Sequence, residues 1–538
     1  MGTLYYGDNL DILTRYIGDA SVDLVYLDPP FNSAQSYNAF FQEKDGTDAA
    51  SQIKAFEDTW HWNIEAEAVY RQITEQPGKV SEVMQAFRTF LGSNDMMAYL
   101  TMMAPRLVEL RRVLKNTGSL YLHCDPTASH YLKLLLDAVF GINNFRSEII
   151  WKRTSGHSDA ERFGSVHDTI FFYVKSDEFV WNQLFQAYEK DYVDQYYRYK
   201  EPDGRLFMSD NLSAAGLSGG GYDYEWKGVR RIWRCPISTM ERLDKEGRVF
   251  YTKNGIPRRK RFLDEAKGMP MQDIWTDVEA LRSWHQERLG YPTQKPTALL
   301  ERIIQTSSNP GDVVLDPFCG CGTTIDAAVK LGRQWIGIDI TQLATTLIKG
   351  RLRDTYGTQL EIKTVGEPVT YQDAVALASK DGDNNKYQFQ WWALGLVGAR
   401  PVEQKKGADG GIDGKILFRD DPRSPKPEQI ILSVKGGKLK ADDIRSLGHV
   451  VSRENAAIGV LITLQEPTAG MRADAASAGF YTHKLNAMQY PKLQILTIEE
   501  LLDGRGIARP SSMSSGDETF RRAPKAAIKA SGQGDLGL

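Results

Sequence analysis

The sequence predicts an α/β protein with a large first domain and a smaller second one. Apolar runs of strand length alternate with helical segments over most of the 538 residues. A strongly polar stretch at 381–385 separates two such alternations. This length is typical of two or three domains. With 41% hydrophobic residues, the chain can also bury a large core.

The first informative strand covers residues 22–27 and ends at an unusual group, Asp28, Pro29, Pro30 and Phe31. The prolines fix φ and remove two backbone donors. Their carbonyls and the carboxylate remain acceptors, and the ring offers a stacking face. This set suits the exocyclic amine of a planar base, which would donate to Asp28 and to the Pro29 carbonyl while the base lies on Phe31. A proline-stiffened strand exit with no ligand is the alternative.

A second signal lies much later in the chain. A strand at 313–316 runs into a glycine-rich turn, a helix follows at 324–331, and a further strand at 335–339 ends in Asp339. This is the plan of a nucleotide-binding βαβ unit, in which the final acid accepts hydrogen bonds from a ribose. Because the turn lacks both G-x-G-x-x-G and a P-loop lysine, a phosphate cradle is disfavoured. An ordinary βα turn is the alternative.

Together these motifs resemble the β-class amino-DNA methyltransferases. Residues 316–324 resemble the S-adenosylmethionine loop of that family, and 28–31 resemble its catalytic motif. Residues 291–296 resemble its other cofactor-side motif, and 6–10 match the strand end before the catalytic strand. The order, with the catalytic motif first, is that of the β class. One departure is Cys321, where the family commonly has the similarly small Ser.

The resemblance implies a Rossmann-like methyltransferase sheet that binds S-adenosylmethionine and methylates a base flipped out of double-stranded DNA. The implied catalytic residues are Asp28, Pro29, Pro30 and Phe31. The implied cofactor-binding residues are Asp8, Thr293, Lys295, Asp316, Phe318, Gly320, Gly322, Thr323 and Asp339. His123, at another strand end, is expected to be structural, because amino methylation in this family needs no histidine.

Adenine N6 is the favoured target, because family members with Asp at the first motif position mostly modify adenine. Cytosine N4 is the alternative. An RNA or protein-amide methyltransferase is a second one, although those enzymes usually carry the cofactor loop first. A non-catalytic DNA-binding protein is a third.

The segment at 175–286 is rich in Tyr, Trp, Arg and Gly and occupies the family's target-recognition position. The net charge of the whole chain is −3, so DNA binding must rest on local basic patches. A solvated basic surface is the alternative. The residues expected to contact DNA are Arg230, Arg231, Arg234, Arg258, Arg259, Lys260 and Arg261.

The last folded region resembles the Mrr-like branch of the PD-(D/E)XK nucleases. Asp413 matches the family's metal carboxylate and Lys435 its strand lysine, which implies a Mg²⁺ site at Asp413. Ser433 stands where the family has Glu or Gln, and Gln390 where a helix Glu often assists. These departures leave weak cleavage and a non-cleaving domain that binds DNA or a partner as alternatives. A restriction nuclease that uses the methyltransferase half for recognition is a further one.

The expected organisation follows from these assignments. No CxxC pair, signal peptide or apolar run of membrane-spanning length is seen, and a cytoplasmic location is expected, with no membrane partner. The expected partners beyond DNA are a second copy of the chain or a restriction subunit. The expected parts are 1–174 (catalytic), 175–286 (target recognition), 287–366 (cofactor), 367–386 (linker), 387–505 (restriction-endonuclease-like) and 506–538 (disordered tail).

Overall fold

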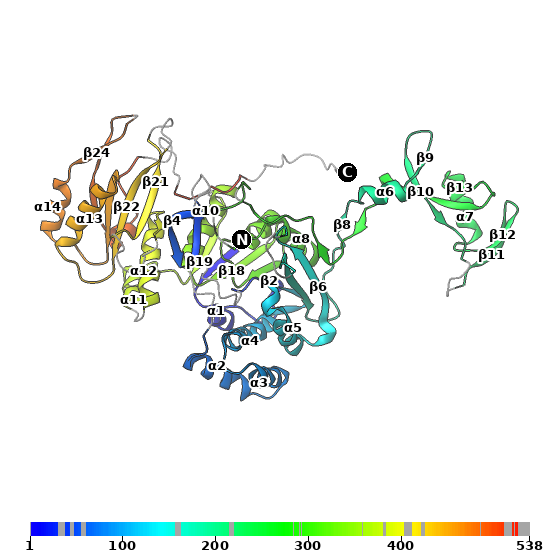
Figure 1. Cartoon of the computed structure of the whole chain (residues 1–538), viewed down its shortest axis with the longest axis horizontal. Coiled ribbons are helices and arrows are strands. Elements are labelled where there is room, and N and C mark those ends of the chain that lie inside the picture. Colours follow the sequence, from blue (N-terminus) through cyan, green and yellow to red (C-terminus); the bar gives the residue numbers. More distant parts are fainter. Residues whose placement is uncertain are drawn as a thin grey trace. The chain divides into compact units, whose positions relative to one another are not determined.

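The computed structural model shows two compact units (Figure 1). One unit joins Met1–Asn182 to Asp273–Leu538, and the other is Gln183–Gln272. The described residues are 2–30, 38–42, 48–54, 61–156, 163–214, 220–282, 284–289, 291, 293–357, 359–379, 383–402, 411–420, 426–484, 486–510, 519–520 and 522–525. Phe31 and most of the tail at 506–538 therefore lie outside the described residues.

A nine-stranded mixed sheet forms the core of the first unit. In spatial order its strands are β16 (Ile274–Trp275), β6 (Phe145–Lys152), β7 (His167–Val174), β5 (Leu114–Cys124), β2 (Val22–Leu27), β17 (Val313–Asp316), β18 (Gln334–Asp339), β1 (Gly2–Tyr6) and β19 (Ile362–Val365). Strand β7 runs antiparallel to both of its neighbours, and all other pairs are parallel.

The centre of this sheet brings together the motifs identified in the sequence. Strand β2 is buried at all six positions, as expected for a parallel strand covered on both faces. It pairs with β17 through Leu24 and Val314, although the two lie far apart in the chain. Parallel strands end at the same edge, so β1, β18, β17 and β2 deliver their carboxyl-terminal residues to one place.

Helices cover both faces of the sheet. One face is packed by α1 (Asn9–Tyr16), α3 (Lys79–Leu91), α4 (Asp95–Val113) and α5 (Pro126–Phe140), with α2 (Ile64–Thr74) outside them. The other face is packed by α8 (Thr297–Ser307), α9 (Thr323–Lys330) and α10 (Gln342–Tyr356). Core leucines such as Leu100 and Leu300 are fully buried, and each such side chain stabilises the fold by roughly 1.5–3 kcal/mol.

The second unit is built from small antiparallel sheets. Its largest sheet has the order β13 (Val249–Tyr251), β14 (Pro257–Phe262), β10 (Leu206–Asn211) and β9 (Tyr199–Lys200). Two further pairs are β11 (Tyr222–Trp226) with β12 (Val229–Trp233), and β8 (Phe185–Gln186) with β15 (Met269–Pro270). Helices α6 (Lys190–Tyr196) and α7 (Ile237–Lys245) complete the unit. The fully buried Trp233 anchors its apolar cluster.

A five-stranded sheet forms the C-terminal domain. Its order is β20 (Arg400–Pro401), β21 (Gly414–Phe418), β22 (Glu428–Lys435), β23 (Ile458–Thr463) and β26 (Leu493–Thr497). One face packs against α11 (Tyr371–Ser379), α12 (Asp383–Leu396) and α15 (Ile498–Leu502), and the other against α13 (Asp442–Arg453) and α14 (Ala469–Ser477). Strand β24 (Phe480–Thr482) pairs with β25 (Gln489–Pro491) beside the main sheet.

The segment expected as a linker, 367–386, contains a helix. Helix α11 buries Ala374 and Leu377 in the core of the C-terminal sheet. Two apolar residues on one helical face are enough to attach it, so this helix packs as part of the C-terminal domain. Over the described part of the chain, no helix combines the length and apolar composition that a membrane crossing requires.

Candidate active site

The Asp28 carboxylate stands just after strand β2, at the sheet edge where the four parallel strands end. Its Oδ2 lies 2.5 Å from Nζ of Lys295, and the two side chains are only 15% and 11% exposed. Its Oδ1 is buried and has no hydrogen-bond partner among the described residues. Pro29 beside it is buried as well. The structure therefore holds one carboxylate oxygen and leaves the other as an acceptor for a ligand.

The glycine-rich turn follows β17 on the neighbouring strand. Gly320 and Gly322 have φ of +48° and +75°, a region that favours glycine. A Cβ on Gly322 would lie 2.7 Å from Ile348, and one on Gly320 would lie 3.2 Å from the buried Tyr291. Close packing and backbone conformation both require glycine here.

Two further acids, Asp316 and Asp339, flank this turn. Asp316 accepts a hydrogen bond at Oδ1 from the backbone N–H of Phe318, at 3.0 Å. Asp339 accepts at Oδ2 from the N–H of Gly320, at 2.9 Å, and at Oδ1 from the N–H and hydroxyl of Thr341. The acid at the end of β18 thus fixes the turn after β17.

The electrostatics of this edge favour a cation. Burial raises the pKa of Asp316 to about 7, and the nearby charges of Asp28 and Asp339 add to this rise against hydrogen bonds from Thr324 and Phe318. Burial also raises the pKa of Asp339. Three carboxylates in one buried place repel each other, and a positively charged ligand would relieve that repulsion.

Asp8 uses both of its carboxylate oxygens for contacts within the chain. Its Oδ1 caps helix α1 by accepting from the N–H groups of Leu10 and Asp11, and its Oδ2 pairs with Arg106 at 2.6 Å. The neighbouring Asn9 joins Arg106 to the cofactor-side turn.

That role of Asn9 was not foreseen from the sequence. Its Nδ2 donates to the Pro317 carbonyl at 2.8 Å, and its Oδ1 accepts from Arg106 Nε at 2.6 Å. Asn9 lies within the expected motif at 6–10, so the pattern marked its position but not its contacts. Arg106, on α4, lies in no motif.

Arg351 is a second unforeseen residue. This guanidinium is buried beneath the turn, where it pairs with Asp326 at 2.8 Å and donates to the hydroxyls of Thr323 and Thr297. Thr323 therefore faces Arg351. Thr293, another expected cofactor residue, is half-buried in the turn that precedes α8.

His123 is enclosed in a buried network behind the edge. Its Nδ1 lies 2.9 Å from the Tyr26 hydroxyl, and its Nε2 lies 3.1 Å from Asp168 Oδ2. The imidazole has no exposed surface. Such an imidazole cannot reach a substrate, which fits the structural role expected for it.

The basic residues of the second unit divide into two groups. Most pair internally: Lys260 with Glu201 at 2.6 Å, Arg261 with Asp210 at 2.7 Å, Arg230 with Asp223 at 3.4 Å, Arg258 with the Ser209 hydroxyl and Arg234 with the Ser213 carbonyl. Arg231 and Arg259 are exposed. The unit carries 17 Lys and Arg against 13 Asp and Glu, whereas the whole chain carries 66 against 69. Positive charge is thus concentrated in this unit.

The nuclease-like centre differs from the methyl-transfer edge. Asp413 accepts at Oδ2 from the Val434 N–H at 2.7 Å and from the Ser433 hydroxyl at 3.1 Å, and at Oδ1 from Gln390 Nε2 at 3.3 Å. Lys435 is 41% exposed and lies 3.8 Å from Asp443. Among the described residues, no group of three His, Cys, Asp or Glu side chains could hold a metal ion.

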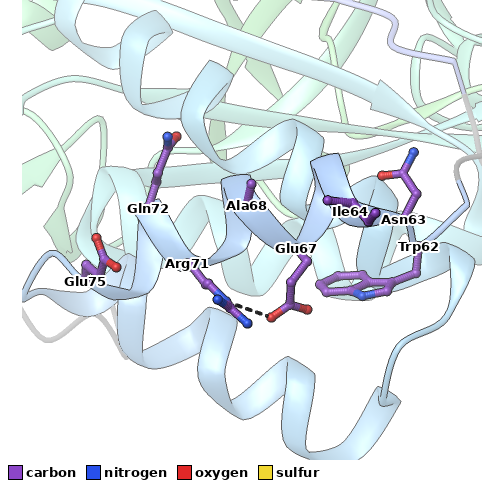
Figure 2. A pocket seen from close by; sticks show the side chains of 8 residues that line it. All are labelled: Trp62, Asn63, Ile64, Glu67, Ala68, Arg71, Gln72 and Glu75. Carbon is purple, nitrogen blue, oxygen red and sulfur yellow. Dashed lines mark hydrogen bonds and ion pairs between the residues drawn. The ribbon is translucent and has the colours of Figure 1, made fainter.

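A surface hollow on helix α2 is a separate feature (Figure 2). Its polar groups pair with one another or with their surroundings: Glu67 contacts Arg71 at 3.2 Å and Arg88 at 3.3 Å, and Arg88 stacks 3.9 Å over the Trp62 ring. Its lining residues include none of those expected to act on a ligand. The sheet edge therefore remains the candidate active site.

Two family models match the chain. A model described as DNA methylase matches residues 22–349. A model described as NACHT-associated inactive Restriction Endonuclease 1 matches residues 387–503.

Individual proteins are also similar to this chain. Type II methyltransferase M.EcaI of Enterobacter cloacae is 33% identical over 47% of this chain and 57% of its own length. The Mod subunit of the Salmonella typhimurium type III restriction-modification enzyme StyLTI is 27% identical over 70% and 57%. DNA adenine methyltransferase YhdJ of Escherichia coli is 26% identical over 63% and 78%. The chain thus spans just over half the length of the first two relatives.

Among solved structures, a Thermus thermophilus protein in complex with S-adenosyl-L-methionine is 16% identical, with a TM-score of 0.34 over 68% of this chain and 100% of that protein. At this TM-score the likeness adds nothing to the fold described above.

Proposed function

Because this chain belongs to the DNA methylase family, we propose that it transfers a methyl group from S-adenosylmethionine to an exocyclic amine of a DNA base. The observation that carries the proposal is the buried Oδ1 of Asp28, an acceptor with no donor among the described residues. It lies at the same sheet edge as the acid-lined glycine turn.

The cofactor fits this turn by its chemistry. The left-handed Gly320 and Gly322 let the backbone approach a ligand. Asp339 is the acid that would accept from ribose hydroxyls, and Asp316 would face a cationic group. When bound, the sulfonium supplies an electrophilic methyl group on a good leaving group.

The residues of this chain would position the amine. One amine N–H donates to Oδ1 of Asp28 and another to the Pro29 carbonyl, which directs the nitrogen lone pair at the methyl group. As the nitrogen–methyl bond forms and the sulfur–methyl bond breaks, the nitrogen would gain positive charge, which the fixed carboxylate would stabilise until the amine releases a proton to solvent. The base reaches this edge only after it leaves the duplex, and Phe31 is proposed to stack on it.

The target is proposed to be adenine N6. Asp at the first motif position supports this assignment, and so does the likeness to the adenine methyltransferase YhdJ. Mass spectrometry of nucleosides from DNA of cells that express the chain tests it, with an Asp28→Ala chain as control. We expect N6-methyladenine with the native chain only. N4-methylcytosine alone would overturn the base assignment but not the reaction.

Double-stranded DNA is the proposed partner, and the second unit the proposed contact surface, with Arg231 and Arg259 among its exposed cations. Substituting either with Ala should weaken DNA binding and reduce its salt dependence. Arg205→Ala is the matched control, since that residue is not among the expected DNA contacts and pairs with Asp264 within the unit. We also propose a cytoplasmic location. By its likeness to a Mod subunit, a restriction subunit is proposed as a further partner of this chain. Co-purification from cells that express both chains tests this partner.

The C-terminal domain is proposed to bind DNA or a partner without cleaving DNA. Mg²⁺ prefers carboxylate oxygen, and Asp413 is surrounded by neutral donors where a metal site would need further carboxylates. Incubation of the purified chain with unmethylated DNA and Mg²⁺ or Mn²⁺ is expected to give intact DNA. Cleavage that disappears in an Asp413→Ala chain would overturn this.

A further inference from the structure

We propose that Lys295 is a positioning residue for Asp28 and acts on the methyl-transfer step, in place of the cofactor binding that its motif implies. This inference rests on the proposed methyltransferase function. Its basis is the ion pair between Lys295 Nζ and Asp28 Oδ2, across 267 residues of sequence, between side chains that are both nearly buried.

The ion pair distinguishes the two oxygens of one carboxylate. Lys295 occupies Oδ2, while Oδ1 keeps no donor among the described residues. A carboxylate without this anchor could rotate about its Cβ–Cγ bond and present either oxygen. With the anchor, one oxygen faces the amine in a fixed orientation, and little reorganisation is needed during transfer.

The chain holds the lysine rigidly at the start of helix α8. The preceding Gln294 accepts from the Leu289 N–H at 2.8 Å and donates to the Glu287 carbonyl at 2.6 Å. The Glu287 carboxylate in turn accepts from the hydroxyl and N–H of Thr297, in the first turn of α8. These contacts close a small loop around Lys295, so its position is set by backbone as well as by charge.

A second carboxylate lies within the electrostatic reach of Lys295. Burial acts to raise the pKa of Asp168, but the hydrogen bond and charge of His123 lower it. The charge of Lys295 adds to this lowering. Asp168 holds His123, and His123 holds the hydroxyl of Tyr26, two residues before Asp28 on strand β2. The charge of the lysine therefore acts both on the Asp28 carboxylate and on the buried network of Asp168 and His123.

The test separates transfer from cofactor binding. Lys295→Met keeps an unbranched side chain only one atom shorter and removes its charge. We expect kcat at saturating S-adenosylmethionine to fall by about 10- to 100-fold, the range found when a partner that orients a ligating group is removed. Cofactor affinity, measured by calorimetric titration, should change by less than about threefold, because the lysine acts on the carboxylate that faces the amine. Lys295→Gln serves as the second variant, and thermal unfolding checks that each variant is folded.

A double-mutant cycle with Asp28→Asn then identifies the route of the effect. If Lys295 acts through Asp28, Lys295→Met should cost little more activity once Asp28 is replaced. Unchanged kcat in a folded Lys295 variant, or a full additive loss in the double variant, would overturn the inference while leaving the proposed function intact. A native chain that transfers no methyl group to DNA would overturn both.

Discussion

The nine-stranded sheet and the C-terminal five-stranded sheet each carry an aspartate at a candidate site, and the two carboxylates differ in their hydrogen bonding. Asp28 has one oxygen on Lys295 and the other without a donor among the described residues. Asp413 has both oxygens occupied, by Gln390 on one side and by Ser433 and a backbone N–H on the other.

The difference shows how a reactive carboxylate becomes a structural one. Gln390 and Ser433 stand where the nuclease family commonly supplies metal-side groups, and both are donors here. Donors at these two positions satisfy the remaining acid, because buried polar groups need partners, and they would leave a metal ion with fewer acceptor oxygens. At the edge of the nine-stranded sheet, by contrast, the buried Oδ1 of Asp28 has no donor among the described residues.

The largest effect is expected from Asp28→Ala. Methyl transfer should lose on the order of 2–4 kcal/mol of transition-state stabilisation, as when one preorganised polar group is deleted. Cofactor affinity should be nearly unchanged, because Asp28 faces the amine. Single-turnover kinetics and calorimetric titration with S-adenosylmethionine measure the two quantities. Full activity in this variant would remove Asp28 from the mechanism.

Asp339→Ala should show the reverse pattern. Loss of a charged acceptor for ribose hydroxyls should weaken cofactor binding by about 1.5–3 kcal/mol, the usual size of a hydrogen bond to a charged group. Part of this loss arises from the turn, since Asp339 also holds the Gly320 N–H. Thr341→Val is a control that removes the hydroxyl contact to the same carboxylate together with the cap that this hydroxyl places on the Ala344 N–H of α10. Equal cofactor affinity in native and Asp339→Ala chains would refute the ribose assignment.

Asp413→Ala should act on stability and leave methylation intact. Its removal leaves the donors of Gln390, Ser433 and Val434 without their acceptor, at a cost of about 1–3 kcal/mol. Urea unfolding followed by a probe in the C-terminal domain measures this cost. Asp413→Asn keeps one acceptor oxygen and should cost less. If Asp413→Ala is as stable as the native chain, the comparison between the two aspartates fails.

Local patterns in the sequence predicted the strands well. Residues 22–27 and 313–316 are strands with the expected bounds, because apolar runs are typical of central parallel strands. The contacts that orient the site residues could not be predicted from local patterns in the sequence. Lys295 contacts Asp28 only because distant segments of the chain pack together. Asp8 caps α1 and pairs with Arg106. Likewise, the helix at 371–379 is stabilised by tertiary burial that its polar surroundings did not suggest.

The smallest predicted effect is a pH dependence of stability and of cofactor affinity that arises from Asp316 in the acid-lined turn. The pKa of Asp316 is raised to about 7, so its carboxyl is partly protonated near neutrality in the free protein. Because the folded pKa lies above the ordinary value of 3.8, this group's contribution to stability is full below that value and is lost as pH rises through about 7.

A cationic cofactor should bind better to the ionised carboxyl, so its affinity should rise over the same range. Between pH 6 and pH 8 the increase should be about tenfold, or about 1.4 kcal/mol, as expected for one proton released on binding near pKa 7. Calorimetric titration in buffers of different ionisation enthalpy measures both the affinity and the proton release. In an Asp316→Asn chain, which cannot titrate there, the dependence should disappear. A pH dependence that persists in that variant would assign the titration to another group of the edge, with Asp339, whose pKa is also raised by burial, as the next to test.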